Sequence, residues 1–211
     1  YFPLGDMKVD GKFDPKFIER VATFDQPNET FSISYPCIVK DDAGYKLYYQ
    51  PWYPDLTPCV CVIESEDGIH WHRPQLNIYD NRLKENNVVI DHVKDGVFVF
   101  YDTNPACPTA ERYKAVGLAL FPDKGGTPRR CLCCYISPDG YHFTLSHPMT
   151  RYGTFDSLNT AFWDGKRYVC YLRSFHNIPG VDNGALLNTD EIYHYGRFLN
   201  QSTRDIRVMY S

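Results

Sequence analysis

Apolar and polar residues alternate along short stretches of this chain, and the stretches end in Gly, Pro or Asp. A period of two is the pattern of antiparallel strands that have one face in a core. Such strands are predicted in three successive groups, whose first members are SISYPCIVKDD (32–42), GVFVFYDTNP (96–105) and LNTAFWDGK (158–166). Each group continues with a second strand that contains tyrosine, at 45–52, 111–120 and 167–175.

The third strand of each group runs towards a serine, and these serines are spaced by 72 and 74 residues: Ser65, Ser137 and Ser211. The first two begin the same motif, Ser-x-Asp-Gly-x-x-aromatic, at 65–71 and 137–143. Its Asp can accept backbone N–H bonds and its Gly can adopt positive φ, so the motif predicts a turn rather than a catalytic group. A fourth strand is expected after each turn, at 69–74 and 141–145.

Four strands repeated every 70 residues or so are typical of β-propeller blades. The predicted fold class is therefore all-β, with four-stranded antiparallel blades at about 31–80, 86–150 and 155–211 after an N-terminal extension at 1–30. Propellers usually have about four to eight blades, so three blades cannot close a ring. We expect the chain to be truncated at its C-terminal side, and the alternative is that chains pair to complete the fold.

Composition narrows the possible partners. The formal net charge is −4, the pI is near 6.0, and no basic stripe is visible, so a nucleic-acid partner is not expected. The apolar runs are too short to span a bilayer, so a membrane partner is not expected either. No sequence pattern implies a cofactor or a metal site, and the oligomeric state stays open.

The eight cysteines lie in apolar runs that resemble strands: Cys37, Cys59, Cys61, Cys107, Cys131, Cys133, Cys134 and Cys170. They lack the C-x₂-C pairs typical of zinc sites. Because a free cysteine behaves as a small buried hydrophobe, we expect mostly buried thiols, no zinc and no disulfide framework. Reduced thiols and the lack of a visible signal peptide favour a cytoplasmic location, although the compartment stays open.

Three aspartates are the candidate catalytic groups. Asp102 follows the first strand of the second group, Asp156 precedes that of the third, and Asp25 occupies the comparable stretch before the first group. Carboxylates from different blades that meet at a propeller axis would supply the acid and the base or nucleophile that glycoside cleavage needs. The candidates for binding or orienting a substrate are Glu111, Arg112, Arg173 and Trp163.

Four segments carry a resemblance to a known family: 64–90, 99–116, 137–143 (SPDGYHF) and 154–173 (TFDSLNTAFWDGKRYVCYLR). They resemble five-bladed propeller proteins labelled glycoside-hydrolase-like, which are related in fold to glycoside hydrolase families 32 and 43. The resemblance covers about 31–211 and implies a five-bladed ring, of which this chain supplies about three blades. It also implies catalytic acids from the first three blades, with Asp102 at the second-blade position and Asp156 at the third. The first-blade signature is absent, and Asp25 in FDQPN stands nearest to its place.

The sequence therefore predicts a carbohydrate-active hydrolase that acts on an oligosaccharide or polysaccharide through carboxylates at the propeller axis. Two alternatives stay open at this point. One is a propeller that binds glycans without cleaving them, and the other is an interaction scaffold.

Overall fold

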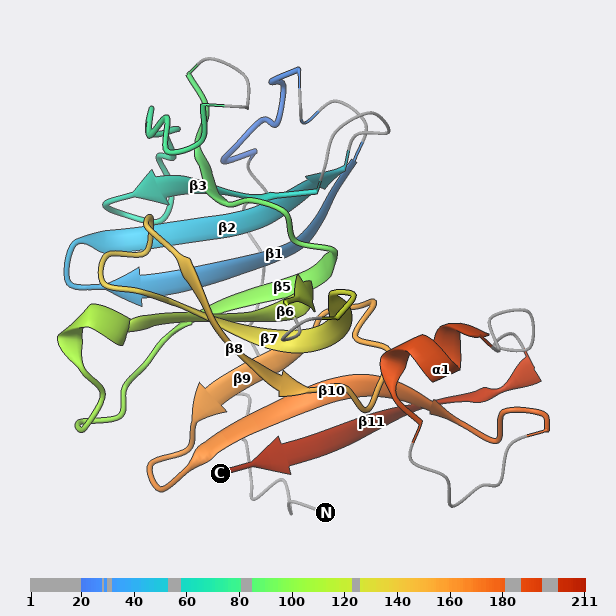
Figure 1. The fold of residues 1–211 in the computed structure, drawn as a ribbon. Helices are drawn as coiled ribbons and strands as arrows, with labels where there is room; N and C mark the ends of the chain where they lie inside the picture. Colours follow the sequence, from blue (N-terminus) through green and yellow to red (C-terminus); the bar gives the residue numbers. More distant parts are fainter. Residues whose placement is uncertain are drawn as a thin grey trace, which may run out of the picture.

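The structure is a computed structural model, and it describes residues 20–27, 29, 32–52, 58–80, 85–122, 126–180, 187–194 and 201–211. Most of the expected extension at 1–30 lies outside these residues. The described chain forms three antiparallel sheets that follow one another along the sequence (Figure 1). The predicted all-β class is confirmed.

The first sheet contains β1 (Ser32–Asp41), β2 (Gly44–Trp52), β3 (Val60–Ser65) and β4 (Val88–Ile90), in that order across the sheet. The fourth strand was expected at 69–74, and this expectation is wrong. That segment makes a single bridge to Glu64, through His72, and β4 pairs with β3 only after a further loop. The aromatic residue after the turn, Trp71, packs against the sheet without pairing as a strand.

The second sheet contains β5 (Asp95–Tyr101), β6 (Tyr113–Phe121), β7 (Arg129–Ser137) and β8 (Thr144–Thr150), again in chain order. A short 3₁₀ helix, Thr109–Glu111, lies between β5 and β6. Here the strand expected at 141–145 is present in part, because β8 begins at Thr144. Its four strands lie within the predicted second blade at 86–150, but Val88–Ile90 of that range pairs with the first sheet.

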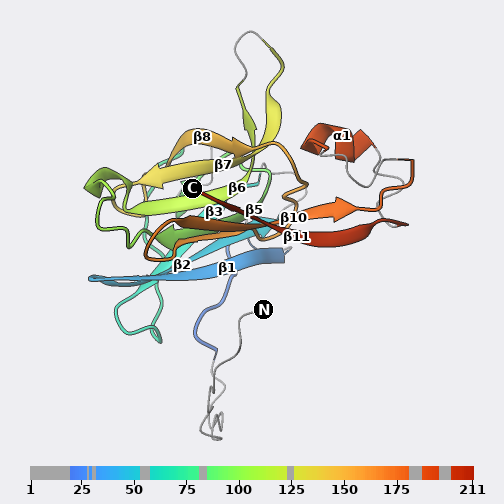
Figure 2. The ribbon, with the colours of Figure 1, turned by 90° about the horizontal axis from the view of Figure 1, so that it is seen from below.

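The third sheet contains β9 (Thr160–Trp163), β10 (Tyr168–His176) and β11 (Thr203–Tyr210). The long segment between β10 and β11 includes a short helix, α1 (Thr189–His194), which packs near the end of β10 (Figures 1 and 2). The sequence encodes the start of this helix as a capping box. The Asn188 side chain accepts the Glu191 N–H at 3.1 Å, and the Glu191 carboxylate accepts the Asn188 N–H at 2.8 Å.

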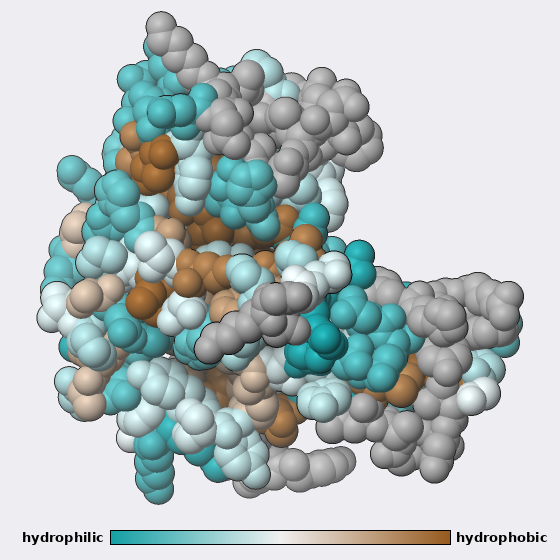
Figure 3. Space-filling model, viewed as in Figure 1, coloured by the Kyte–Doolittle hydropathy of each residue, from teal (hydrophilic) through white to brown (hydrophobic). Residues whose placement is uncertain are grey.

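The sheets pack face to face through apolar residues, with β1 against β5 and β5 against β9. One cluster, which includes Val39, Tyr48 and Val99, fills the space between the first two sheets, and a second, which includes Leu132 and Leu172, lies between the last two. In the space-filling view, hydrophobic residues gather over the middle of the face and hydrophilic residues surround them (Figure 3). Successive sheets whose first strands are neighbours have the arrangement of propeller blades.

The repeated Ser-x-Asp-Gly motif forms the predicted turns. Ser65 Oγ accepts the N–H of Gly68 at 2.8 Å, and Ser137 Oγ accepts that of Gly140 at 2.9 Å. Both glycines have positive φ, 79° and 82°. The Asp67 carboxylate accepts two further backbone N–H groups in the turn, so the motif is structural, as expected.

All eight cysteines are buried, which confirms the expected environment of the thiols. Within the ranges that the structure describes, no group of three His, Cys, Asp or Glu side chains is arranged to hold a metal ion. Within the same ranges, no helix has the length and apolarity to cross a membrane.

Candidate active site

The first strands of the first two sheets are irregular where they begin. The β1–β2 register shifts between Ser34 and Cys37, and the β5–β6 register shifts between Asp95 and Phe98. Inside the bulge of β1, Tyr35 has a φ of 55°, which a tyrosine rarely adopts. Bulges redirect side chains and are frequent beside active sites. This end of β1 and β5 is therefore the place to look for chemistry.

A close backbone contact brings the third sheet to the same end. Gly96 has a φ of 61°, and a Cβ atom built on it would lie 2.1 Å from the carbonyl oxygen of Ser157. Only glycine fits there, so the residues just before β9 can touch the beginning of β5. As a result, Asp156 and Asp95 are close enough for their charges to interact.

Asp95 is half-buried and hydrogen-bonded on two sides. Its carboxylate accepts the N–H of Gly96 at 2.8 Å and a hydrogen bond from the hydroxyl of Tyr35. Burial raises the pKa of Asp95 above its ordinary value, although these two hydrogen bonds oppose the shift, and the charge of Asp156 adds to it. Burial, together with the negative charge of Asp95, also raises the pKa of Tyr35 to about 12.

Asp156 has a different environment, because its carboxylate forms an ion pair with the guanidinium of Arg173 on β10. The two side chains are 30% and 18% exposed, so solvent reaches both. Asn159 fixes the loop that carries Asp156. Its side chain accepts the N–H of Arg173 at 3.2 Å and donates to the carbonyl of Ser157 at 2.7 Å. The loop is thus tied to β10 at the position of the ion pair.

This arrangement supplies two carboxylates from two different sheets, with different surroundings. A half-buried acid with a raised pKa can hold and donate a proton, whereas an ion-paired carboxylate can act as a charged group. An open cavity of about 700 Å³ lies next to Arg173, between the residues that precede β9 and the beginning of β11. Arg173 thus connects the carboxylate of Asp156 with this cavity.

Of the residues proposed from the sequence, Asp156 and Arg173 come together, but Asp102 lies elsewhere. Asp102 follows β5, whereas Asp95 begins it. A strand rises about 3.3 Å per residue, so the two ends of β5 are about 20 Å apart. Asp102 and Asp156 therefore do not share a cavity, and the prediction that they sit at equivalent strand ends is wrong.

Asp102 instead forms the second-sheet charge cluster, defined as Asp102, Lys114 and Tyr168. Its fully buried carboxylate contacts the ammonium of Lys114 at 2.9 Å and accepts the hydroxyl of Tyr168, on β10, at 2.7 Å. Burial alone would raise the pKa of Asp102, but Lys114, the N–H of Asn104 and Tyr168 outweigh it and lower the pKa below its ordinary value. The cluster joins the second sheet to the third.

The same arrangement occurs one sheet earlier. In the first-sheet charge cluster, Asp41 at the end of β1 contacts Lys46 on β2 at 2.6 Å and accepts the hydroxyl of Tyr113 on β6. The aspartate and lysine again belong to one sheet and the tyrosine to the next. This repetition identifies Asp102 as a group that holds neighbouring sheets together.

The remaining candidates surround Asp102 rather than the site. Glu111 contacts Lys114 at 3.6 Å, and Arg112 donates to the carbonyl of Asp102 at 3.0 Å. The ring of Trp163 packs against that of Tyr168 with centroids 5.0 Å apart. These contacts explain the positions of Glu111, Arg112 and Trp163 without a ligand.

Asp25 also lies away from the site. Its side chain is 66% exposed and contacts Arg73 at 3.4 Å. The carboxylate that is buried in this stretch is that of Glu29, which contacts Arg73 at 2.7 Å and accepts the hydroxyl of Tyr49. The residues around it pack against the first sheet on the side of Cys59 and Cys61.

Sequence reasoning missed Asp95 and Tyr35. One signal could have found Asp95, because KDGVFV and FDSLNTAFW each place an acid just before the first strand of a sheet. Tyr35 gave no such signal, because its position depends on a bulge and a positive φ that the residue type disfavours.

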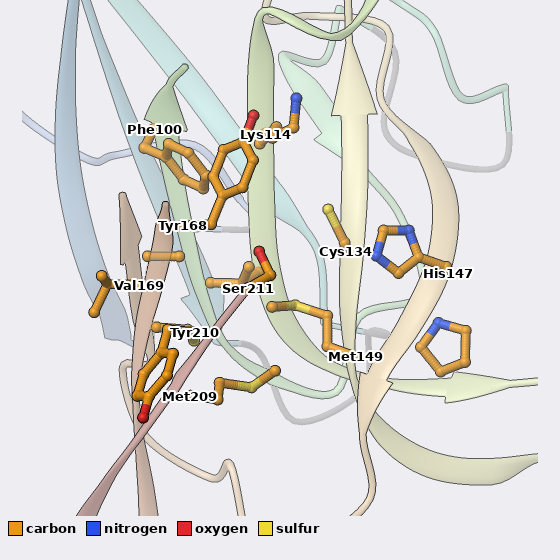
Figure 4. Close-up of a pocket in the computed structure, with 14 residues that line it drawn as sticks. Phe100, Lys114, Cys134, His147, Met149, Tyr168, Val169, Met209, Tyr210 and Ser211 are labelled. Atoms are coloured by element: carbon orange, nitrogen blue, oxygen red, sulfur yellow. The ribbon is translucent and has the colours of Figure 1, made fainter. Parts of the chain in front are cut away.

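A second cavity, of about 390 Å³, lies between the second and third sheets (Figure 4). Apolar side chains such as Phe100, Met149 and Met209 make up most of its wall, and Lys114 and Tyr168 lie at one end. Both of these polar groups are engaged with Asp102, and Cys134 and His147 also line the cavity.

No protein-family model matches the chain, and no curated protein matches it. Solved structures do match. One is described as showing that the GH130 family of mannoside phosphorylases contains glycoside hydrolases that target β-1,2 mannosidic linkages in Candida mannan (15% identity, 71% of this chain, 44% of that chain, TM-score 0.44). Another is a glycosyl hydrolase from Bacteroides ovatus (17% identity, 76% of this chain, 47% of that chain, TM-score 0.46). A third is described as a glycoside hydrolase (12% identity, 90% of this chain, 50% of that chain, TM-score 0.46).

The chain thus spans about half the length of the solved structures that it matches. The descriptions of these matched structures name glycoside hydrolases, the kind of protein that the sequence was found to resemble. The number of blades in the ring and the relation to families 32 and 43 stay predictions. Because each of these TM-scores is below 0.5, the activity proposed for this chain has to rest on its own side chains.

Proposed function

We propose that this chain carries the acidic centre of a site that cleaves glycosidic bonds in an oligosaccharide or polysaccharide. The observation that supports the proposal is that Asp95 and Asp156, from two successive sheets, are close enough for their charges to interact, and that Asp156 is paired with Arg173, which lines an open cavity. Their environments differ in the way that glycoside cleavage requires, since one is a half-buried acid with a raised pKa and the other is ion-paired.

In this proposal Asp95 is the proton donor and Asp156 is the charged carboxylate. As the glycosidic C–O bond breaks, the proton of Asp95 passes to the leaving oxygen. Asp156 either takes a proton from the attacking water or attacks the anomeric carbon itself. Arg173 holds Asp156 in place, and the hydroxyl of Tyr35 orients Asp95.

The test compares Asp95→Asn and Asp156→Asn with the unchanged protein on a panel of aryl glycosides. General acid–base groups contribute about 10²–10⁴-fold, so each substitution should lower kcat/KM by that factor. Asp164→Asn is the matched control, because Asp164 lies in an exposed turn on the third sheet and pairs with Arg167. If both site variants keep the full rate on a substrate that the protein cleaves, the assignment is wrong.

A second candidate function is glycan binding without cleavage. The observation that favours it is Tyr35, because the first sheet contributes a tyrosine to the site and not a third carboxylate. The same panel separates the two functions. Saturable glycan binding with no turnover of any substrate would favour the binding protein.

A further inference from the structure

The charged side chains around the open cavity beside Arg173 are not all neutralised. Arg173 is paired with Asp156. The carboxylate of Asp205 lies 3.4 Å from His176 Nδ1 and 3.4 Å from Arg207 Nε. Arg204 lines the same cavity and is exposed, and its side chain has neither an ion pair nor a hydrogen bond with another described residue.

We propose that this cavity binds a sugar that carries a carboxylate, a uronic acid residue, and that Arg204 pairs with that carboxylate. The proposal rests on the proposed function and names its substrate class. A guanidinium presents two parallel N–H groups that match the two oxygens of a carboxylate. A neutral sugar would leave this positive charge without a counterpart.

Two further features of the cavity bear on the ligand: an exposed aromatic ring suits a sugar, and two nearby carboxylates limit its negative charge. Tyr171 lies in its wall with 39% of its surface exposed, so its ring can pack against the face of a pyranose. The carboxylates of Asp156 and Asp205 are also near, and a second negative charge on the ligand would meet both of them. A singly charged carboxylate is therefore favoured over a doubly charged phosphate group.

The experiment measures binding of D-galacturonate and D-glucuronate by calorimetric titration, with galactose and glucose as their neutral counterparts. A charge-assisted hydrogen-bonded pair should make at least one acid bind about ten-fold more tightly than its neutral counterpart. Arg204→Gln should abolish this preference, and added salt should weaken it. Arg167→Gln is the matched control, because Arg167 is a similarly exposed arginine in the turn beside Asp164 and should leave the preference unchanged.

Several results would overturn the inference. The first is that acid and neutral sugars bind equally tightly, and the second is that neither acid binds. The third is that the preference for the acid survives in Arg204→Gln. The fourth is that inorganic phosphate binds in a way that depends on Arg204 while neither acid binds. These results leave the proposed function standing if neutral aryl glycosides are still cleaved. Conversely, uronate binding that depends on Arg204 in a protein that cleaves nothing would support the inference while the proposed cleavage fails.

Discussion

Replacing Asp102 with alanine removes the acid from the second-sheet charge cluster and tests whether this residue holds the sheets together. The carboxylate is 0% exposed and its partner Lys114 is 12% exposed. After the substitution, the nearest remaining carboxylate is that of Glu111, at 3.6 Å and 39% exposed. Lys114 would then be a mostly buried ammonium that keeps hydrogen bonds to the Cys107 sulfur at 3.1 Å and the Glu111 carbonyl at 2.9 Å but has lost its buried counter-charge. Tyr168 would lose its acceptor.

Breaking a buried ion pair by removing one partner typically destabilises a protein by about 3–5 kcal/mol. We therefore expect Asp102→Ala to lower the free energy of unfolding by about 3 kcal/mol, which is a large share of the usual 5–15 kcal/mol or so. Adding Lys114→Met removes the uncompensated ammonium, so the double variant should be more stable than Asp102→Ala alone. Urea unfolding measures these differences as shifts of the midpoint at constant slope.

The control is Asp164→Asn. Asp164 follows β9 as Asp102 follows β5, but it is exposed, so this substitution should leave the urea midpoint nearly unchanged. The reasoning is refuted if Asp102→Ala loses less than about 0.5 kcal/mol, the scale of ordinary surface substitutions. Asp102→Ala, Lys114→Met and the double variant form a double-mutant cycle. The reasoning is also refuted if the changes in unfolding free energy of the two single variants add up to that of the double variant, because the two side chains would then not interact.

The pH dependence of the same difference follows from the lowered pKa of Asp102. A carboxyl whose pKa is lower in the folded state stabilises the protein fully above the unfolded value, about 3.9 for aspartate. This contribution is lost as the pH falls from there through the folded pKa. The gap in stability between the unchanged protein and Asp102→Ala should therefore be largest near neutral pH and should narrow below about pH 4.

Two further substitutions test the site and a turn. Tyr35→Phe removes a hydrogen bond that stabilises the charged form of Asp95, so the pKa of Asp95 should rise further, and an unchanged NMR titration of this carboxyl would contradict the assignment. Gly140→Ala should destabilise more than Gly165→Ala by about 1–3 kcal/mol in urea unfolding. Both glycines have positive φ, 82° and 96°, so the backbone strain of an alanine is similar at the two positions. A Cβ at Gly140 would lie 2.6 Å from Tyr48 Oη, whereas a Cβ at Gly165 meets nothing within 4 Å. Equal losses of stability in the two variants would contradict the packing argument.

The strands and turns were predictable because they depend on local chemistry. Alternating residues place one face of a strand in the core, and the Asp and Gly of the turn at 65–71 act on backbone groups a few residues away. The fourth strand of the first sheet was misplaced because its pairing is not local. β4 (Val88–Ile90) reaches β3 (Val60–Ser65) after an irregular loop, and nothing in the sequence at 69–74 reports that its backbone pairs only at His72.

The candidate site was half predictable for a related reason. A strand has two ends. The sequence shows that an acid is next to a strand, but it does not show which acids from different strands lie close together in the folded protein. Asp41 ends the first strand of its sheet, and Asp102 and Asp164 directly follow theirs, whereas Asp95 and Asp156 lie where such strands begin. The first strands are neighbours in space, so acids that follow them lie at one end and acids that precede them at the other. At the first end, Asp41 and Asp102 are used to join sheets. At the second, a bulge, a positive φ and a glycine without room for a side chain hold Asp95 and Asp156 near each other, and that costly geometry is the reason to expect chemistry there.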